Sequence, residues 1–313
     1  MRILLDTDLG SDVDDALALG LILAEPELLQ LEAVTTVAGD PQARARATAR
    51  LLGLAGCTGV EVCAGAAEPL VRKNRFAWRD IETEGYPEGP DALLSEEPGP
   101  ERIVRAAREV SDLQLLAIGP LTNLAHALAL DPKLPKRVAG LTVMGGHIRR
   151  VAIGDFECAP GIDYNLCSDP EATMSVLGAG FDTRLVTADV TLSTWLTEED
   201  RESLSRAPGP IAPLLAELVR RWTPWQHEIF TGLGGTLAED NAAFLHDPLT
   251  VLSLIDPASL HFERLQIVPT IERGVLRTRE VAASLGMGAP MEVATGVDAE
   301  SARRAIVDRL LRV

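Results

Sequence analysis

Five aspartates stand within ten residues near the start of the chain: Asp6, Asp8, Asp12, Asp14 and Asp15. Carboxylates this close repel one another unless a cation lies among them or some of them face water. The cluster offers oxygen ligands and contains neither cysteine nor histidine, so Ca²⁺ or Mg²⁺ fits it far better than Zn²⁺. A plainer alternative is a polar loop in which an aspartate caps the following helix.

The residues around the cluster indicate how it is positioned. The apolar run 3–5 comes before it and the alanine and leucine pattern 16–19 follows, which predicts a strand that ends in acid and turns into a helix. A second apolar, β-branched stretch, Leu31–Ala38, ends at Gly39 and Asp40 in the same way. Because parallel strands carry their ligands beyond their carboxyl ends, Asp8 and Asp40 are expected to face one crevice.

Strand and helix patterns alternate along the rest of the chain. Further strands are expected at Val60–Ala64, Leu113–Ile118, Leu141–Met144 and Phe181–Ala188, and an antiparallel pair at Leu265–Ile271 and Val275–Glu280. Helices are expected at 42–55, with an arginine-rich outer face, at 101–110, from Thr122 and Asn123, from Asp169, from Thr197 and at Ala299–Leu311. This alternation predicts an α/β fold: a single domain over residues 1–313, with a mainly parallel open sheet flanked by helices, a Rossmann-like core and an active site at the C-terminal ends of the strands.

Three stretches break the alternation. Glu68–Pro100 is rich in proline, glycine and charge and is expected to be a lid or a binding loop. Gly154–Asn165 is expected to be irregular, and 222–240 mixed, with Trp222 and Trp225 either packing in the core or stacking on a ligand. The pair Gly145–Gly146 would let the backbone approach another part of the protein closely.

The composition limits the partners. The 313 residues include 46 acidic and 29 basic side chains, which gives a net charge of −17 at pH 7. Such a surface repels phosphate backbones and carries no basic membrane-binding face, so neither nucleic acid nor a membrane is expected as a partner. The four cysteines show no zinc-binding spacing, and no signal peptide or bilayer-length apolar stretch is recognisable, so a cytoplasmic location is expected.

An ordered series of short segments resembles the signature of a known enzyme family. The segments are Asp6–Gly10 with Asp14–Ala16, Thr35–Gly39, Gly119–Leu124, Met144–Gly146, Asp163–Asn165, Asp169–Ala172 and His246–Leu249. In this order they resemble the inosine-uridine preferring nucleoside hydrolases. The first motif alone would be a weak signal, but the ordered series is a strong one.

The resemblance implies a Ca²⁺-dependent N-ribohydrolase that cleaves a nucleoside to free base and ribose. Ca²⁺ would be bound by the carboxylates of Asp8, Asp15 and Asp247 and by the backbone carbonyl of Thr122. Asp8 would also hold and deprotonate the attacking water. His246 would protonate the leaving base, a role that suits a histidine with a pKa near neutrality.

The same resemblance implies a set of substrate-binding residues: Asp14, Asp40, Met144, Asp155, Asp163 and Asn165. Asp14, Asp163 and Asn165 would take the ribose hydroxyls. Family members are commonly dimers or tetramers, so a homo-oligomer is expected. The identity of the base and of the sugar is not readable from these residues.

The sequence departs from the family pattern around the sugar and the lid. Two extra residues precede Asp14, so either Asp12 or Asp14 could take the sugar-binding place; Asp14 is preferred because it preserves the start of the helix. Asp40 and Asp155 stand where asparagine is usual, and Asp163 where glutamate is usual, which changes the groups that these positions can bind. A His-Gly segment usual near position 80 is not recognisable.

Two alternatives stay open. The strand followed by Asp6 and Asp8 also resembles the start of haloacid-dehalogenase phosphatases, although Leu9 and the absence of an evident partner lysine count against it. A calcium-dependent ribose- or nucleoside-binding protein without turnover would share the same metal ligands. Among the other histidines, His227 is a less certain neighbour of the site, and His126, His147 and His261 are expected to be structural.

Overall fold

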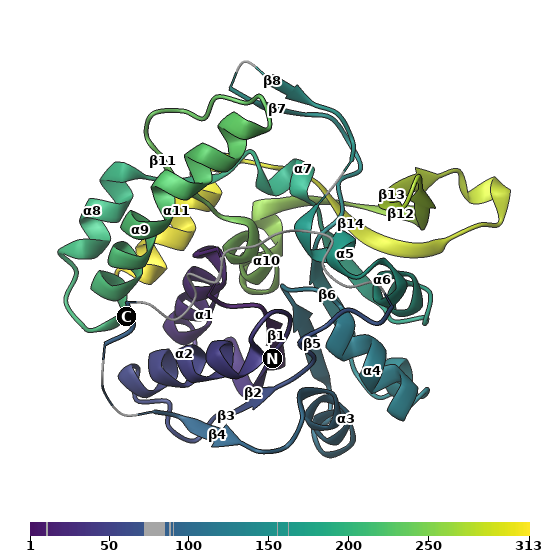
Figure 1. Cartoon of the computed structure of the whole chain (residues 1–313), viewed down its shortest axis with the longest axis horizontal. Coiled ribbons are helices and arrows are strands. Elements are labelled where there is room, and N and C mark those ends of the chain that lie inside the picture. Colours follow the sequence, from purple (N-terminus) through teal and green to yellow (C-terminus); the bar gives the residue numbers. More distant parts are fainter. Residues whose placement is uncertain (11, 72–84, 88, 90, 155, 162) are drawn as a thin grey trace.

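The apolar run before the aspartates forms β1 (Arg2–Thr7), a central strand of a large sheet (Figure 1). The computed structural model describes residues 1–10, 12–71, 85–87, 89, 91–154, 156–161 and 163–313. The other strands of this sheet are β2 (Gln30–Thr36), β3 (Glu61–Ala64), β4 (Leu93–Ser95), β5 (Leu113–Ala117), β6 (Gly140–Met144), β9 (Thr183–Val186), β12 (Leu260–Glu272), β13 (Val275–Val281) and β14 (Ala289–Val297). Within the described residues the strand order is β13-β12-β14-β9-β6-β5-β1-β2-β3-β4.

The helices lie on both faces of this sheet. They are α1 (Asp14–Ala24), α2 (Pro41–Leu54), α3 (Gly99–Glu109), α4 (Thr122–Leu130), α5 (Tyr164–Ser168), α6 (Pro170–Leu177), α7 (Ala188–Thr191), α8 (Glu198–Ser205), α9 (Ile211–Gly232), α10 (His246–Ile255) and α11 (Ala299–Leu310). Short 3₁₀ helices are η1 (Leu134–Lys136), η2 (Pro257–Ser259) and η3 (Ala283–Leu285). Two further antiparallel pairs lie outside the sheet: β7 (Val151–Ile153) with β8 (Phe156–Cys158), and β10 (Trp195–Thr197) with β11 (Asn241–Phe244).

The strands bury their side chains in two cores, one on each face. Ile3 and Leu5 belong to the core that includes α1, α2, α9, α10 and α11, whereas Leu4 belongs to the core that includes α3, α4 and α6. This division follows from the strand geometry, in which successive side chains point to opposite faces. A strand that is apolar on both sides is typical of a parallel sheet covered by helices.

The chain order places a crevice between β1 and β5. From β1 the chain crosses to β2, and from β5 it crosses to β6 on the other side, so the two connections diverge at the carboxyl ends of the pair. Ligands of open α/β sheets bind at such a point. The predicted α/β fold with a mainly parallel sheet is therefore confirmed, with β12 as the antiparallel strand between β13 and β14.

Several expected elements differ in the structure. Residues 222–232, expected to be mixed, complete α9, which contains Pro224 in its interior. The irregular stretch after Gly154 contains β8, which pairs with β7. The strand expected at Phe181–Ala188 is shorter, and Ala188 starts α7.

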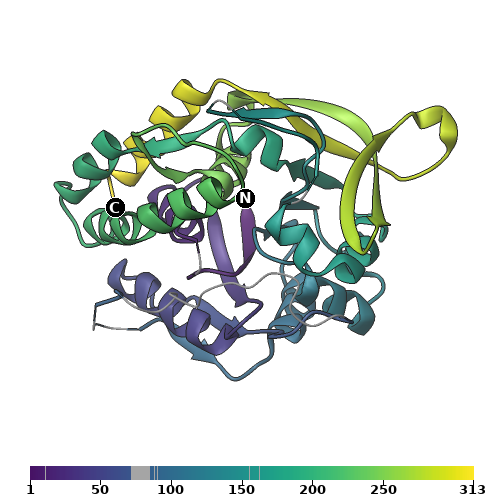
Figure 2. The same ribbon diagram turned by 45° about the horizontal axis from the view of Figure 1, so that its top comes forward.

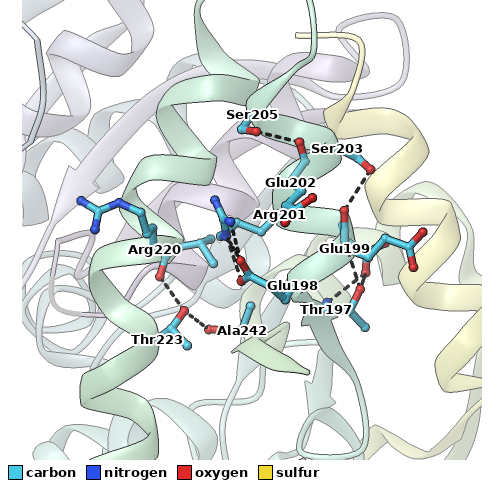
Figure 3. Close-up of polar contacts among 12 residues, drawn as sticks. Thr197, Glu198, Glu199, Arg201, Glu202, Ser203, Ser205, Arg220, Thr223 and Ala242 are labelled. Atoms are coloured by element: carbon cyan, nitrogen blue, oxygen red, sulfur yellow. Dashed lines mark hydrogen bonds and ion pairs between the residues drawn. The ribbon is translucent and has the colours of Figure 1, made fainter. Parts of the chain in front are cut away.

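Figure 3 shows how α8 and α9 are fixed beside β11. Thr197 caps α8: its hydroxyl accepts a hydrogen bond from the backbone N–H of Asp200, whose carboxylate accepts the Thr197 N–H in return. On α9, the Thr223 hydroxyl contacts the carbonyl of Ala242 at 2.8 Å. Since β11 leads directly into α10, this contact also steadies the segment that carries His246.

The segment that contains η3, between β13 and β14, projects from the end of the sheet (Figures 1 and 2), whereas β12 contacts α6 and β13 contacts α5. Leu285 and Met287 in this segment are exposed. In the part of the chain that the structure describes, no helix combines the length and the apolar character needed to cross a membrane.

Asn123 joins three parts of the fold at the edge of the crevice. Its side-chain amide donates to Asp6 Oδ1 (2.7 Å) and to the Thr36 carbonyl (3.1 Å), and its Oδ1 accepts the N–H of Ala66 (2.8 Å). The residue is fully buried. The cap residue of α4 is Leu121, and no side chain caps that helix end.

Replacing Asn123 with leucine should lower the free energy of unfolding by about 2–4 kcal/mol, because three buried polar groups would lose their partner. Chemical denaturation monitored by circular dichroism would measure the change. Gln42→Leu on the exposed side of α2 is the control and should change the stability by less than about 0.5 kcal/mol. Equal stability of the two variants would contradict a linking role for Asn123.

Candidate active site

A cavity of about 420 Å³ opens at the crevice between β1 and β5. One part of its wall is acidic and is made by Asp8, Asp12, Asp14, Asp15 and Asp247, with His246 beside them. A second part is mostly apolar and includes Ile153, Phe156, Leu192, Trp222, Ile229, Phe230 and Leu233. The third part lies at the ends of β5 and β6 and in the turn before α5, and includes Ile118, Met144, His147, Asp163 and Asn165.

The acidic part can hold a metal ion. Carboxylate oxygens of Asp14, Asp15 and Asp247 lie within 4.8 Å of one another, and all three residues are buried. Asp247 Oδ1 has no hydrogen-bond partner among the described residues. A buried, unsatisfied carboxylate oxygen beside two further carboxylates is the ligand set that a hard divalent cation requires.

The electrostatics of the cluster indicate the same need. Burial raises the pKa of Asp8 to about 6 and that of Asp12 to about 7. Burial, and then repulsion from neighbouring aspartates, raises the pKa values of Asp14, Asp15 and Asp247 well above the usual range. The folded protein therefore binds either protons or a cation here near neutral pH.

The fold fixes the acidic side chains from several directions. The Thr7 hydroxyl donates to Asp15, and the Asp247 N–H donates to Asp14 Oδ2 at 3.4 Å. Helices α1 and α10, which start at these aspartates, pack side by side (Figure 1). Gly119, after β5, lies so close to Asp8 that a Cβ at this position would stand 2.7 Å from Asp8 Oδ1.

Arg44 supplies positive charge behind the cluster. The sequence placed the arginines of α2 on an outer face, but Arg44 is only 1% exposed, and its Nε donates to the carbonyl of Ala38 at 2.9 Å. Its charge lowers the pKa values of Asp8 and Asp15, against the larger effect of burial. Arg44 therefore offsets part of the repulsion that the five aspartates create.

His246 stands between the acidic and the apolar parts. Its Nδ1 lies 2.6 Å from the Thr191 hydroxyl, and its ring is tilted against that of Phe244 at 5.3 Å between centroids. Burial lowers the pKa of His246 to about 4, so the expected pKa near neutrality is wrong. The ring is neutral at pH 7, and when the Thr191 hydroxyl donates to Nδ1, the ring proton lies on Nε2, the nitrogen left for a ligand.

Asn165 and Asp163 are held at the start of α5. The Asn165 amide donates to the carbonyls of Ile118 (2.7 Å) and Met144 (3.3 Å), so it joins the ends of β5 and β6. Asp163 Oδ1 accepts the N–H of Leu166 at 2.8 Å and caps α5. Burial raises the pKa of Asp163, and bonds from backbone N–H groups and the nearby His147 oppose the rise.

Two predicted site residues, Asp40 and Thr122, do not line the cavity. Asp40 is exposed, and its Oδ1 accepts the Ala43 N–H at 2.9 Å as the cap of α2, so we propose a structural role for it in place of the expected substrate contact. The sequence Gly-Asp-Pro favours this cap because proline suits the first turn of a helix. Thr122 begins α4, and its hydroxyl donates to Asp169 at 2.8 Å; the ligand role of its carbonyl stays a prediction. Asp155 lies outside the described residues.

Two features of the site were missed from the sequence. His147, expected to be structural, lines the cavity, and the hairpin of β7 and β8 contributes part of the apolar wall. The preceding glycine pair was a usable signal for His147, because it brings the chain close to α5: a Cβ at Gly145 would stand 2.7 Å from Leu166. Trp222 lines the cavity, whereas His227 Nε2 lies 2.8 Å from the Asn241 carbonyl, outside it.

Comparison with known proteins identifies the family. A family model described as inosine-uridine preferring nucleoside hydrolase matches residues 3–304. The chain belongs to this family. It is 29% identical to the probable uridine nucleosidase 2 of Arabidopsis thaliana over 99% of this chain and 97% of that protein, and 31% identical to the pyrimidine-specific ribonucleoside hydrolase RihA of Escherichia coli over 88% and 83%.

Solved nucleoside hydrolases share the fold. The plant nucleoside hydrolase PpNRh1 matches with a TM-score of 0.85 at 24% identity, over 99% of this chain and 98% of that one. The purine-preferring ribonucleoside hydrolase of Gardnerella vaginalis matches with a TM-score of 0.83 at 23% identity, over the same shares. The chain is thus an enzyme of the nucleoside hydrolase class, with an acidic cluster that can bind a metal.

In the absence of divalent cations, this nucleoside hydrolase should be more stable at mildly acidic pH than at pH 8. The raised pKa values mean that the folded state binds more protons than the unfolded chain between about pH 4 and pH 7, so the free energy of unfolding should rise as the pH falls from about 8 to about 5.5. Melting temperatures recorded in EDTA would measure this trend. Saturating Ca²⁺ should reduce it because the cation replaces the protons.

The variant Asp247→Asn tests the location of the cation. In EDTA at pH 8 it should melt at a higher temperature than the parent, since one repelling charge is removed, and it should lose most of the Ca²⁺-induced rise in melting temperature. Asp40→Asn keeps a capping side chain and should behave like the parent. An unchanged Ca²⁺ response in Asp247→Asn would place the cation elsewhere.

Proposed function

We propose that the protein is a Ca²⁺-dependent N-ribohydrolase that cleaves the N-glycosidic bond of a nucleoside to give free base and ribose. The observation that carries the proposal is one cavity in which buried carboxylates, with an unsatisfied Asp247 oxygen, stand beside a neutral histidine and an apolar wall. The family of the chain supports this reaction class.

The cation would be held by Asp8, Asp15 and Asp247, with the carbonyl of Thr122. Asp14 shares the oxygen cluster with Asp15 and Asp247, so it can contact both the cation and a sugar hydroxyl that the cation binds. A purely oxygen-based ligand set with several carboxylates favours Ca²⁺. When bound, Ca²⁺ would orient two sugar hydroxyls and a water and make that water more acidic.

Asp8 would take the proton of the attacking water. Its pKa of about 6 in the absence of a cation suits a general base near neutral pH. Breaking the bond from the sugar to the base develops positive charge on the sugar ring, which the surrounding carboxylates stabilise. The ribose hydroxyls would be held by Asp14, Asp163 and Asn165. The sugar and the attacking water would then react within one oriented complex.

His246 would assist the departure of the base. Because its ring is neutral, it would act by donating an Nε2–H hydrogen bond to a base nitrogen or oxygen, which stabilises the negative charge that develops on the leaving base. The base itself would lie against the apolar wall formed by α9 and the β7–β8 hairpin. Gln226 also lines the cavity, and its amide is held by Asn241 and by the Phe244 N–H.

Base preference, assembly and location stay predictions. The relatives include proteins named for pyrimidine specificity and for purine preference, so the family alone does not indicate the base. A homo-oligomer, dimer or tetramer, is still expected, and the projecting segment that contains η3 offers the exposed apolar side chains of Leu285 and Met287 for it. All four cysteines are free, which suits the expected cytoplasmic setting.

The phosphatase alternative is set aside. Its nucleophile would be Asp6, which is 2% exposed, does not line the cavity and accepts hydrogen bonds from Thr35 and Asn123. These hydrogen bonds fix the Asp6 side chain to β2 and α4, so it is not accessible to a substrate. The family of the chain points in the same direction.

A panel of purine and pyrimidine nucleosides, assayed for released ribose with and without EDTA, tests the function. Ribose release that EDTA abolishes and Ca²⁺ restores is expected. Asp8→Asn should lower kcat/KM by more than about 10³-fold, since it removes the base and weakens the cation site, whereas Asp40→Asn should stay within about twofold of the parent. Absence of release from every nucleoside, despite bound Ca²⁺, would instead indicate a binding protein without turnover.

His246→Ala tests the role in leaving-group departure. Natural nucleosides should lose about 10²- to 10³-fold in kcat, whereas 4-nitrophenyl riboside, whose leaving group needs no proton, should lose less than about fivefold. His227→Ala is the matched control and should affect neither substrate strongly. Equal losses on both substrates would contradict a hydrogen bond from His246 to the leaving base.

A further inference from the structure

Thr7, the last residue of β1, joins this strand to the first turn of α1. Its side chain is fully buried, and its hydroxyl donates a hydrogen bond to Asp15 Oδ1. Asp15 is one of the three aspartates whose carboxylate oxygens lie within 4.8 Å of one another. Thr7 is not itself part of the cavity wall, so it can act on a ligand in the cavity only through Asp15.

A second hydrogen bond fixes the direction of the Thr7 hydroxyl. The Leu9 N–H donates to Thr7 Oγ1 at 3.1 Å and so occupies one of the lone pairs of the hydroxyl oxygen. An ionised carboxylate can only accept hydrogen bonds, so the hydroxyl proton must point to Asp15. The hydroxyl is therefore oriented toward Asp15 by the turn that follows β1.

The backbone of Thr7 is held within the sheet. Its carbonyl accepts the Val37 N–H at 3.0 Å, and the residue pairs with Thr36 in the register of β1 and β2. The donor that Asp15 meets is thus part of a central strand. Such a support stays in place whether or not a cation is bound.

The carboxylate of Asp15 needs this support because its neighbours repel it. Asp14 and Asp247 lie beside it below the surface, where water screens their charges poorly. A free Asp15 side chain would lower the repulsion by rotating out of the cluster, and a cation would then have to draw it back. A fixed donor on one oxygen sets the rotation of the carboxylate in advance, as partners of metal ligands commonly do.

Thr35 shows what a buried threonine does without such a connection. It lies in β2 opposite Asp6, is fully buried, and its hydroxyl donates to Asp6 Oδ1 at 2.6 Å. Asp6 does not line the cavity. Thr7 and Thr35 are thus alike in burial, in the kind of element and in the kind of hydrogen bond, but only the Thr7 bond ends on a carboxylate of the cluster.

We propose that Thr7 is a positioning residue whose hydroxyl holds the Asp15 carboxylate in the cluster and thereby sets the affinity of the site for Ca²⁺. The inference rests on the proposed function, in which Asp15 is a ligand of the cation. It adds to that function a residue that touches neither the cation nor the substrate.

Calcium titrations of threonine variants test the inference. Thr7→Val keeps the shape of the side chain and removes the hydroxyl, so the Kd for Ca²⁺, measured by calorimetry on protein freed of cations, should rise about 10- to 100-fold. The Ca²⁺-induced rise in melting temperature should shrink in parallel. Thr7→Ser keeps the donor and should stay within about threefold of the parent. Thr7→Cys, a weaker donor, should give an intermediate Kd and provides a second measurement if the valine variant does not fold.

Thr35→Val is the matched control. It removes a buried hydroxyl from the neighbouring strand, so its melting temperature in EDTA should fall, as that of Thr7→Val may be lowered by the same kind of loss. Its Kd for Ca²⁺ should nevertheless stay within about twofold of the parent. A Kd in Thr7→Val that equals that of Thr35→Val would show a purely structural role and overturn the proposal.

The same titrations separate failure of this inference from failure of the proposed function. If the parent binds Ca²⁺ and Thr7→Val binds it weakly, but no nucleoside releases ribose, the hydrolase function fails and the positioning role stands. If nucleosides are hydrolysed in a Ca²⁺-dependent way and Thr7→Val binds Ca²⁺ like the parent, the positioning role fails alone. A parent that binds no Ca²⁺ would overturn both.

Discussion

The mutual repulsion of buried carboxylates is the constraint on which the rest of the site depends. Asp8, Asp14, Asp15 and Asp247 come from two distant parts of the chain and meet below the surface, where their charges are poorly screened. The fold offsets this in part. Asp14, Asp15 and Asp247 stand in the first turns of α1 and α10, where the helix dipole favours negative charge.

Arg44 contributes a full positive charge from behind, out of reach of the cavity. Neither the helix ends nor Arg44 brings the pKa values of the cluster back to the usual range, so the protein keeps an affinity for a further positive species. A site that is folded but electrostatically incomplete binds a divalent cation strongly, and the binding adds to the stability of the fold. Without a cation, burial raises the pKa of Asp8 to about 6.

Prediction from the sequence succeeded where the chemistry was local. The strand that runs into Asp8 and the helix that starts at Asp14 are set by short apolar patterns, and the alternation of such patterns was enough to place them on a parallel sheet. The roles of residues that depend on tertiary packing were harder to predict from the sequence. Arg44 belongs to a helix whose polar pattern suggests an exposed face. Its side chain is buried because its Nε donates a hydrogen bond to the Ala38 carbonyl, a contact that the sequence does not reveal.

Other errors have equally physical causes. The end of α9 was not recognised from the sequence because it contains Pro224 and is followed by glycines, and both residue types are normally unfavourable inside a helix. His147 carries no sequence partner that would separate a ligand-binding histidine from a structural one. The pKa of His246 could not be read from its neighbours in sequence, because burial against Phe244 and the rest of the cavity wall lowers it.

The acidic part and the apolar part of the cavity are built from different kinds of elements. The acidic groups and His246 stand at strand ends and helix starts, which the two cores hold rigidly. The apolar wall comes from the last turns of α9 and from the β7–β8 hairpin, whose residue Gly154 packs directly on the backbone of Thr236. Substitutions in these outer elements can reshape the apolar wall without moving a carboxylate. The turn after β6, which also lines the cavity, is instead fixed to the sheet, because the Gly145 N–H donates to the Val186 carbonyl and the Ile148 N–H donates to Asp189, so this part of the wall should tolerate substitution less well.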